Sequence, residues 1–493
     1  MGKVFDNKKY LKLQSNKILE RVNLFGDKLY IEFGGKLFDD YHASRVLPGF
    51  EIDSKVKVLA SIKKKLEVII TISADDIQNG KVRNDLGIPY EDDVLRLIDE
   101  FEKRSIVVGS VVITRFASQP LAVSFSKKLK NLGIKVYFHY NIDGYPHDTE
   151  HVLSEEGFGK NEYIETSHPI IIVTGPGPGS GKMATCLSQL YHDNIRGIRA
   201  GYSKYETFPV WNLPLRHPVN LAYEAATADL NDVNMIDHFH LEAYNESAVN
   251  YNRDVEVFPV LNKMFERIYG TSPYKSPTDM GVNMVGFAII DEESAKEASK
   301  QEIIRRYLDA LCFQKVGKFS QESVEKIYRI IKELNISIDD RKVVSAAIKK
   351  MDQTNCPAVA IQVNKNKIIC GKKTKLLSAT SAAIINVLKF YAKIPDELPL
   401  LPKSVIEPLQ DLRSNRIGRN TGRLQVYDVL VALAITATTN PIANAALEQL
   451  PKLAGAQLHS TTMLDLSELE ILNKLKINTT MGTFQDSKLL KEI

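Results

Sequence analysis

Apolar and polar positions alternate in blocks through the first third of the chain. Short runs rich in β-branched residues have the length and composition of buried strands, and the candidates are Leu29–Phe33, Glu67–Ile72, Ile106–Thr114, Lys135–Tyr140 and Ile170–Thr174. The segments between them repeat apolar residues at helical spacing: Ser54–Lys65, Glu91–Lys103, Leu121–Asn131 and Lys182–Tyr191. Strands and helices in alternation predict a mostly parallel sheet with crossover helices.

The pattern changes twice after this region. From Tyr202 to Asn283 polar and aromatic residues crowd together, which favours loops that line a cleft. Residues 291–352 then keep apolar residues at helical spacing. Beyond Pro357 strand-like runs return at Ala358–Val363 and Ile368–Cys370, before a helix over Thr380–Tyr391.

These patterns predict an α/β protein in three parts. Residues 1–290 form an α/β domain with the parallel sheet and a P-loop-like corner, residues 291–355 form a helical subdomain, and residues 356–493 form a C-terminal α/β domain. Length allows this division, because 493 residues exceed the size of one ordinary domain.

The corner is a glycine-proline run between the strand at 170–174 and the helix that begins near Lys182. It reads Gly175-Pro-Gly-Pro-Gly-Ser-Gly-Lys182. Backbone N–H groups and the positive end of a helix dipole converge in such a loop, which is how proteins hold phosphate. The donors left by the two prolines predict a ligand site at Gly177, Gly179, Ser180, Gly181, Lys182, Met183 and Thr185.

The match to the P-loop pattern G-x-x-x-x-G-K-[ST] is incomplete. Gly175 lies one place too early, and Met183 stands where a hydroxyl would meet magnesium. Ser180 or Thr185 can supply that hydroxyl instead. Two alternatives stay open: a dinucleotide-binding loop, with Glu206 as the acidic residue, or a strand-to-helix turn whose glycines serve packing alone.

Other segments offer partners for the corner. Gly286–Ile290 has the form of an apolar strand that ends in Asp291 and Glu292, which can hold magnesium, although Asp291 as a helix cap is the favoured interpretation. Asp237 and His240 are candidate acid–base residues. The spacing of His238 and His240 suits one face of a strand, but the third ligand of a metal site is missing, so we expect no metal there.

An arginine cluster lies at Arg413, Arg416, Arg419 and Arg423. Guanidinium groups suit phosphate or carboxylate, yet a solvated or subunit-bridging surface is the favoured interpretation. The net charge of +4 is too small to indicate nucleic acid or a membrane surface as partner. With four cysteines and no C-x-x-C, no apolar leader and no long apolar run, a cytoplasmic protein is expected, and a homo-oligomer is compatible with the sequence.

Several long runs resemble one uncharacterised bacterial protein family, domain-of-unknown-function family 1846, over essentially the whole chain. They are the residues 41–50 (YHASRVLPGF), 176–191 (PGPGSGKMATCLSQLY), 211–215 (WNLPL), 217–237 (HPVNLAYEAATADLNDVNMID) and 274–283 (YKSPTDMGVN). The resemblance implies a cytosolic multidomain α/β protein with a helical subdomain and a C-terminal part similar in topology to the cytidine deaminase-like class.

The resemblance indicates little about the reaction or the residues that would catalyse it. Some members bear an ATP-dependent peptidase label, but the zinc-ligand motif H-E-x-x-H is missing from this sequence. The family has proline where this chain has His238, which weakens His238 more than His240 as a functional residue. No catalytic residue is carried over from the family.

The sequence therefore predicts a small-molecule phosphate ligand, with ATP or another nucleotide and Mg²⁺ as candidate cofactors. Lys182, Asp237 and His240 are the candidate catalytic residues, and phosphoryl transfer or NTP-driven chemistry is the expected reaction class. The alternative is a non-catalytic sensor or assembly protein that binds a nucleotide or an anion.

Overall fold

The computed structural model describes residues 3–83, 86–364, 367–416 and 423–484. The chain divides into two compact units. The N-terminal unit comprises residues 2–224 and 231–299, and the C-terminal unit comprises residues 225–230 and 300–493.

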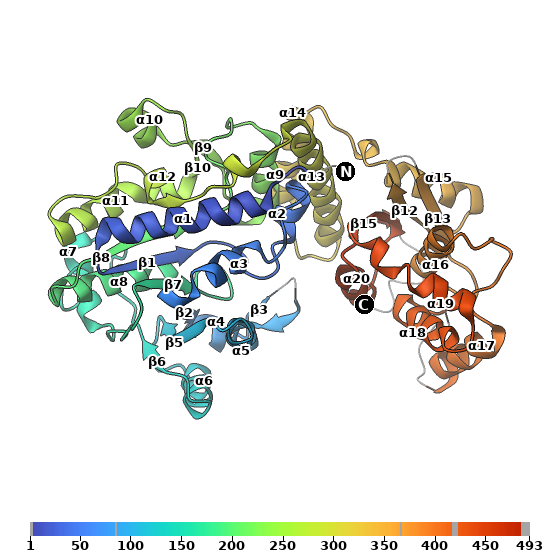
Figure 1. Ribbon diagram of the computed structural model, residues 1–493, viewed down its shortest axis with the longest axis horizontal. Coiled ribbons are helices and arrows are strands. Elements are labelled where there is room, and N and C mark those ends of the chain that lie inside the picture. The colour runs from blue at the N-terminus through green and yellow to red at the C-terminus, as the bar shows by residue number, and fades with distance from the viewer. Residues whose placement is uncertain (1–2, 84–85, 365–366, 417–422, 485–493) are drawn as a thin grey trace. The chain divides into compact units, whose positions relative to one another are not determined.

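A parallel sheet forms the centre of the N-terminal unit (Figure 1). In the described residues it has seven strands, in the spatial order β11 (Gly281–Val282), β8 (Ala200–Tyr205), β1 (Lys28–Phe33), β7 (Ile170–Thr174), β2 (Leu66–Ser73), β5 (Val107–Thr114) and β6 (Val136–Phe138). All of the recorded strand pairs run parallel. The parallel sheet predicted from the sequence is confirmed.

The central strands are apolar because both of their faces are covered. All residues of β7 and β2 are buried, as expected for strands in the middle of a parallel sheet. Tyr30 and Tyr202 point to the same face and pack in one apolar cluster with Cys186 of α8 (Lys182–Ile195) and Phe265 of α11 (Asn252–Tyr269). The other face carries α1 (Asn7–Phe25), whose Tyr10 hydroxyl lies 2.7 Å from that of Tyr205.

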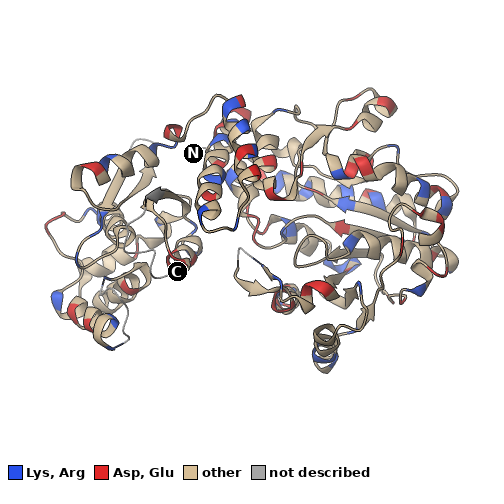
Figure 2. Cartoon of the chain, turned by 180° about the vertical axis from the view of Figure 1, so that it is seen from behind, with Lys and Arg blue, Asp and Glu red and all other residues tan. Residues whose placement is uncertain are grey.

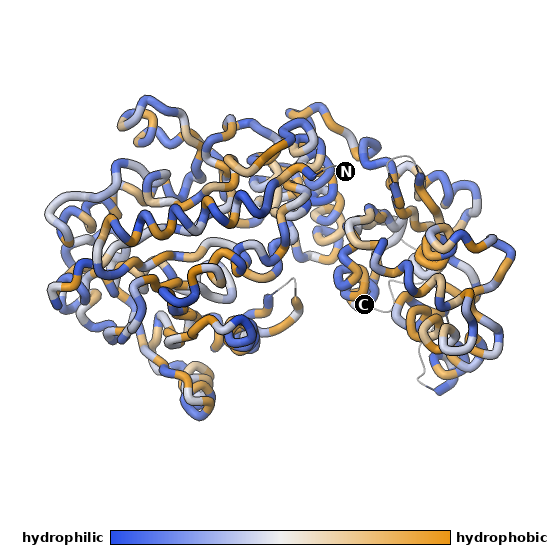
Figure 3. Tube along the Cα trace, viewed as in Figure 1, coloured by the Kyte–Doolittle hydropathy of each residue, from blue (hydrophilic) through white to orange (hydrophobic). Residues whose placement is uncertain are grey.

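Helix α1 lies along the sheet in Figure 1 and alternates between apolar and hydrophilic positions in Figure 3. Asp6 accepts a hydrogen bond from the backbone N–H of Lys9 and so caps its start. The other helices of this unit are α2 (Tyr41–Val46), α3 (Ser54–Ser61), α4 (Ala74–Gln78), α5 (Tyr90–Glu102), α6 (Pro120–Asn131), α7 (Thr149–Val152), α9 (Pro218–Ala226), α10 (His238–Tyr244), α12 (Pro277–Met280) and the start of α13 (Glu292–Lys315). Two short hairpins accompany them: β3 (Val82–Arg83) with β4 (Ile88–Pro89), and β9 (Asn234–Ile236) with β10 (Val249–Tyr251).

The order of the strands creates a switch in the direction of the connections. The chain leaves β1 towards β2, on the far side of β7, whereas it leaves β7 towards β8, on the far side of β1. Neighbouring strands with connections in opposite directions mark the position where open α/β sheets bind ligands, beyond the carboxyl ends of the strands. The glycine-rich loop follows β7 at this position.

The C-terminal unit has a mixed sheet of four strands among the described residues, in the order β13 (Lys367–Lys372), β12 (Ala358–Asn364), β14 (Gln457–Thr462) and β15 (Asn478–Phe484). Only β14 and β15 pair in parallel. Besides the end of α13, its helices are α14 (Gln321–Glu333), α15 (Lys342–Thr354), α16 (Ala379–Ala392), α17 (Lys403–Asp411), α18 (Val426–Ala437), α19 (Pro441–Leu447) and α20 (Leu466–Lys474). This confirms α/β structure in the C-terminal part.

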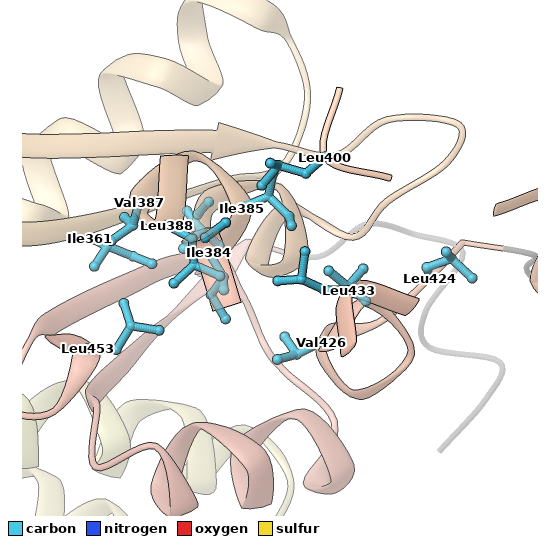
Figure 4. Packing of buried hydrophobic residues seen from close by; sticks show 14 of the residues in the cluster. Ile361, Ile384, Ile385, Val387, Leu388, Leu400, Leu424, Val426, Leu433 and Leu453 are labelled. Atoms are coloured by element: carbon cyan, nitrogen blue, oxygen red, sulfur yellow. The ribbon is translucent and has the colours of Figure 1, made fainter. Parts of the chain in front are cut away.

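Helix α16 is the centre of this second core. Figure 4 shows Ile384 and Leu388 of α16 near Ile361 of β12, with Val426 and Leu433 from the region of α18. Helix α18 packs one side against this core through Val426, Val429 and Leu433. Among the described residues, no helix combines the length and the apolar character needed to cross a bilayer.

Two local predictions were wrong. Residues 202–283 include more regular structure than the loops expected from their polarity, above all the 18-residue helix α11, whose apolar spacing is interrupted by Pro259. Gly286–Ile290 is no strand, because Gly286–Ala288 forms a 3-10 turn. The backbone N–H of Ser294 donates to Asp291 Oδ1 over 3.0 Å, which confirms Asp291 as a helix cap.

Candidate functional site

The loop after β7 is held by hydroxyl groups from two neighbouring strands. Thr71 of β2 donates from Oγ1 to Ser180 Oγ over 3.1 Å, and Thr114 of β5 donates from Oγ1 to the Ser180 carbonyl over 2.9 Å. Ser180 is fully buried. Its hydroxyl and its carbonyl therefore serve to fix the loop.

Glycine is required in this loop by close packing and by backbone conformation. A Cβ at Gly177 would lie 2.2 Å from Tyr90 Oη, and one at Gly181 would lie 2.7 Å from Thr114 Cγ2. Gly179 and Gly181 have φ of +78° and +89°, in the region that disfavours other residues. The loop therefore turns sharply into α8, with Gly181 as the residue before its first turn.

The amide groups of this turn have no hydrogen-bond acceptor among the residues that the structure describes. Within the described part of the chain, no hydrogen bond is made by the backbone N–H of Gly177, Gly179, Ser180, Gly181, Lys182, Met183 or Ala184. The first intrahelical donor is Thr185, which bonds the Gly181 carbonyl over 2.9 Å. Free amides at the start of a 14-residue helix are the arrangement that binds anions.

The ammonium of Lys182 lies over the same turn. Its Nζ donates to the Gly177 carbonyl over 3.2 Å and approaches Ser180 Oγ at 3.5 Å. The side chain is half-buried, and no carboxylate of the described residues forms an ion pair with it. Burial lowers the pKa of Lys182, the charge of Glu32 opposes that effect, and the charges of Lys204 and Arg253 add to it.

Thr185 and Met183 differ in their surroundings. The hydroxyl of Thr185 is fully buried and has no hydrogen-bond partner among the described residues. Met183 packs against the apolar cluster beneath α8, so its side chain serves the core. Of the predicted ligand residues, the structure thus brings the amides and Lys182 together at one turn.

A charged group lies next to the corner, at the carboxyl ends of β1 and β8. Glu32 and Lys204 are paired in register on these adjacent strands. Glu32 accepts a hydrogen bond from Tyr202 Oη over 2.7 Å. Lys204 forms a two-point ion pair with Asp254 of α11, and its Nζ lies 3.8 Å from Glu206 Oε1.

The predicted pair Asp237 and His240 lies elsewhere in the N-terminal unit. Asp237 caps α10 by accepting from the His240 backbone N–H over 3.0 Å, and it also accepts from Thr278 Oγ1 over 2.6 Å. His240 Nδ1 lies 2.9 Å from Ser276 Oγ. In Figure 1 α10 stands apart from β7, so the structure does not bring this pair to Lys182.

The histidine spacing was placed on the wrong element. His238 and His240 belong to helix α10, where residues two positions apart point to different sides. His238 is therefore exposed and His240 is buried. Among the described residues no group of three or more His, Cys, Asp or Glu side chains is arranged to hold a metal ion.

The arginine cluster lies in the C-terminal unit and has acceptors within the chain. Arg413 pairs with Asp428, Arg416 lies 3.5 Å from Asp411, and Arg423 donates from Nε to the Thr374 carbonyl over 2.9 Å. Arg419 lies outside the described residues. Positive and negative residues are interspersed over the helices in Figure 2.

Comparisons with known proteins identify the family. The model of the domain of unknown function DUF1846, N-terminal, matches residues 3–335, and that of DUF1846, C-terminal, matches residues 339–490. The chain belongs to the DUF1846 family. Related members are the UPF0371 proteins of Streptococcus pyogenes serotype M5 (strain Manfredo), 53% identical over 489 residues and 99% of each chain, and of Streptococcus pneumoniae (strain CGSP14), 54% identical over 480 residues and 97% of each chain.

The charged group beside the corner escaped prediction from the sequence of this DUF1846 protein. Glu32, Lys204 and Asp254 come from three distant segments, and Glu206 was considered only as the acidic residue of a dinucleotide site. A signal was present nevertheless. Glu32 and Lys204 are charges inside apolar strands, and charges at such positions require partners.

Proposed function

We propose that this protein binds the phosphate group of a nucleotide or phosphorylated metabolite at Gly177–Met183 and acts on it as an enzyme of the phosphoryl-transfer or NTP-dependent class. The observation that carries the proposal is the run of amides at the start of α8 that have no acceptor in the described chain. The first amides of a helix have no intrahelical acceptor, and here the glycine-rich turn adds the unpaired amides of Gly177, Gly179 and Ser180 to them. Three phosphate oxygens match several such donors at once.

The charge of Lys182 supports the same ligand. A half-buried ammonium with no ion-pair partner among the described residues is held in an unfavourable environment, which is why its pKa is lowered. A phosphate beside it would supply the missing negative charge. The lysine also lies on the first residue of α8, where the helix dipole favours the same anion.

The position in the sheet supports a site at this turn independently of the loop. The directions of the connections reverse between β1 and β7, and ligands of open α/β sheets bind at such reversals. Glu32 is the next-to-last residue of the neighbouring strand β1, and its charge raises the pKa of Lys182 against the effect of burial. Its carboxylate is the group that we expect to meet Mg²⁺ when the ligand is a nucleotide.

The environment of the cysteines fits a reducing compartment. All four cysteines are free, and two of them are buried. We therefore place the protein in the cytoplasm, with a small-molecule ligand as its partner.

Differential scanning fluorimetry with a panel of nucleotides and sugar phosphates tests phosphate binding. A ligand at a hundred times its Kd stabilises the fold by about 2.7 kcal/mol. We expect at least one phosphate compound to raise the Tm of the parent protein and to leave the Tm of Lys182→Ala unchanged. Lys12→Ala, which removes an exposed lysine of α1, is the matched control and keeps the full shift.

Three results would contradict the proposal at different points. An equal shift in the parent and in Lys182→Ala would remove the site, as would the lack of a shift with every phosphate compound. If ATP binds but its labelled phosphate is neither released nor transferred to an acceptor, the protein is a non-catalytic sensor and the enzyme part of the proposal is wrong.

A further inference from the structure

The polar residues beside the corner all face the side of the sheet that α8 and α11 cover. Lys204 and Glu206 are two residues apart at the end of β8, so their side chains point the same way. Tyr202, on the same face, packs against Phe265 of α11. Glu32 joins this face through its hydrogen bond with Tyr202. The group of Glu32, Lys204, Glu206 and Asp254 is called the acid–lysine group below.

Charges alternate in this group. Moving from the glycine-rich turn across the sheet, Lys182 is followed by Glu32 on β1, by Lys204 on β8 and then by Glu206 and Asp254. Lys204 is fixed by Asp254 on one side and approaches Tyr251 Oη at 3.4 Å on the other. Acceptors and donors therefore follow one another along the carboxyl edge of three adjacent strands.

Glu206 is the member without a complete set of partners. It is 9% exposed, and its Oε1 makes no hydrogen bond with any described residue. Burial raises the pKa of Glu206 well above its ordinary value, although the charge of Lys204 opposes that effect. A buried carboxyl oxygen that lacks a hydrogen-bond partner can accept from a hydroxyl group of a ligand.

We propose that the ligand is a phosphorylated polyhydroxy compound, with its phosphate on the Gly177–Met183 turn and its hydroxyl groups on Glu32, Lys204 and Glu206. This inference rests on the proposed function. A hydroxyl group is a donor and an acceptor at the same time, so neighbouring hydroxyls match a row of alternating acids and ammonium groups. An alkyl chain in the same place would leave Glu206 Oε1 without a hydrogen-bond partner besides its 3.8 Å ion pair with Lys204, which is costly in a buried environment.

Isothermal titration calorimetry on the full chain tests this with paired ligands. The sugar arm compares glucose 6-phosphate with n-hexyl phosphate, and the nucleotide arm compares ATP with 2′,3′-dideoxy-ATP. Titration with inorganic phosphate measures the affinity of the glycine-rich turn for a phosphate group alone. We expect the hydroxylated ligand of at least one pair to bind about tenfold more tightly than its partner, because one or two buried hydrogen bonds distinguish them.

Three variants separate recognition from folding. Glu206→Met removes the carboxyl and keeps the side-chain length, and it should abolish the preference for the hydroxylated ligand. Glu206→Gln keeps an acceptor oxygen at this position, and it should keep the preference within about threefold of the parent. Glu32→Gln retains an acceptor for Tyr202 and should reduce the preference without changing the apo Tm.

The outcomes are distinct. No preference in either arm of the parent, or an unchanged preference in Glu206→Met, would overturn the polyhydroxy assignment while phosphate binding stands. If neither inorganic phosphate nor any of the paired ligands binds, the proposed function fails and this inference fails with it. The assignment is supported if all three variants still bind inorganic phosphate and Glu206→Met loses the preference for the hydroxylated ligand. Glu32→Gln can lose the preference as well, whereas Glu206→Gln keeps it.

Discussion

Gly179 and Gly181 of the glycine-rich turn differ in how much space an added side chain would have. Gly181 has φ +89°, and an added Cβ would lie 2.7 Å from Thr114 Cγ2 and 2.9 Å from Thr114 Cβ. Thr114 cannot easily move away, because its hydroxyl donates to the Ser180 carbonyl. Gly179 has a similar φ of +78°, but a Cβ there would meet no atom within 4 Å.

These differences set the expected cost of each alanine. A left-handed backbone costs an alanine roughly 1–2 kcal/mol, which is the whole cost of Gly179→Ala. Gly181→Ala adds the displacement of Thr114, which at roughly 1–3 kcal/mol for overpacking gives a total of about 3 kcal/mol. A loss of 1 kcal/mol lowers the Tm by roughly 3 °C for a unit of this size. We therefore expect Gly181→Ala to melt about 10 °C below the parent protein and Gly179→Ala about 4 °C below it.

Fluorescence of Trp211 measures the effect in the relevant unit. It is the single tryptophan of the chain and belongs to the N-terminal unit. Thermal denaturation is followed for the parent and both variants without ligand. Equal losses of Tm in the two variants would refute the packing of Gly181 against Thr114, and a parent-like Tm for both would refute the left-handed turn.

Two further predictions concern the C-terminal unit. Burial raises the pKa of Glu468 to about 7, so its contribution to the free energy of unfolding is most favourable below pH ~4.5 and falls by roughly 3 kcal/mol as the pH rises to 7. Hydrogen exchange of α16 and α20 peptides, corrected for intrinsic rates, measures this dependence on pH. Glu468→Gln should remove it, and a dependence equal to that of the parent would contradict the prediction. Arg341 is buried and donates to the Asn478 carbonyl over 2.8 Å and to Gln457 Oε1 over 2.7 Å, so Arg341→Met should destabilise this unit by about 3 kcal/mol. Urea denaturation followed by far-ultraviolet circular dichroism measures that loss, and an unchanged midpoint of the C-terminal transition would show that these contacts contribute little.

Local apolar patterns were enough to find most of the sheet. β7 was predicted to its last residue, because five apolar or β-branched positions stand between Pro169 and Gly175. Strands β2 and β5 were found within one residue for the same reason. Helix α1 was missed, because Gln14 and Ser15 occupy buried positions where apolar residues would have marked its inner face.

The candidate site was predictable only in part. The turn and Lys182 are contiguous in sequence, so the run of glycines indicated them. The acid–lysine group depends on strand order, which local patterns do not specify. β7 inserts between β1 and β2, and β8 pairs with the far edge of β1, so Glu32 and Lys204 become neighbours through non-local pairing alone.

The most direct test of an anion on the turn follows the glycine amides themselves. Selective ¹⁵N-glycine labelling, with assignments from single Gly→Ala variants, resolves Gly177, Gly179 and Gly181 for titration with ATP and pyrophosphate. The account predicts large shifts of these three amide resonances and none for Gly197, which follows the opposite end of α8. Three unmoved resonances at saturating ligand would contradict it.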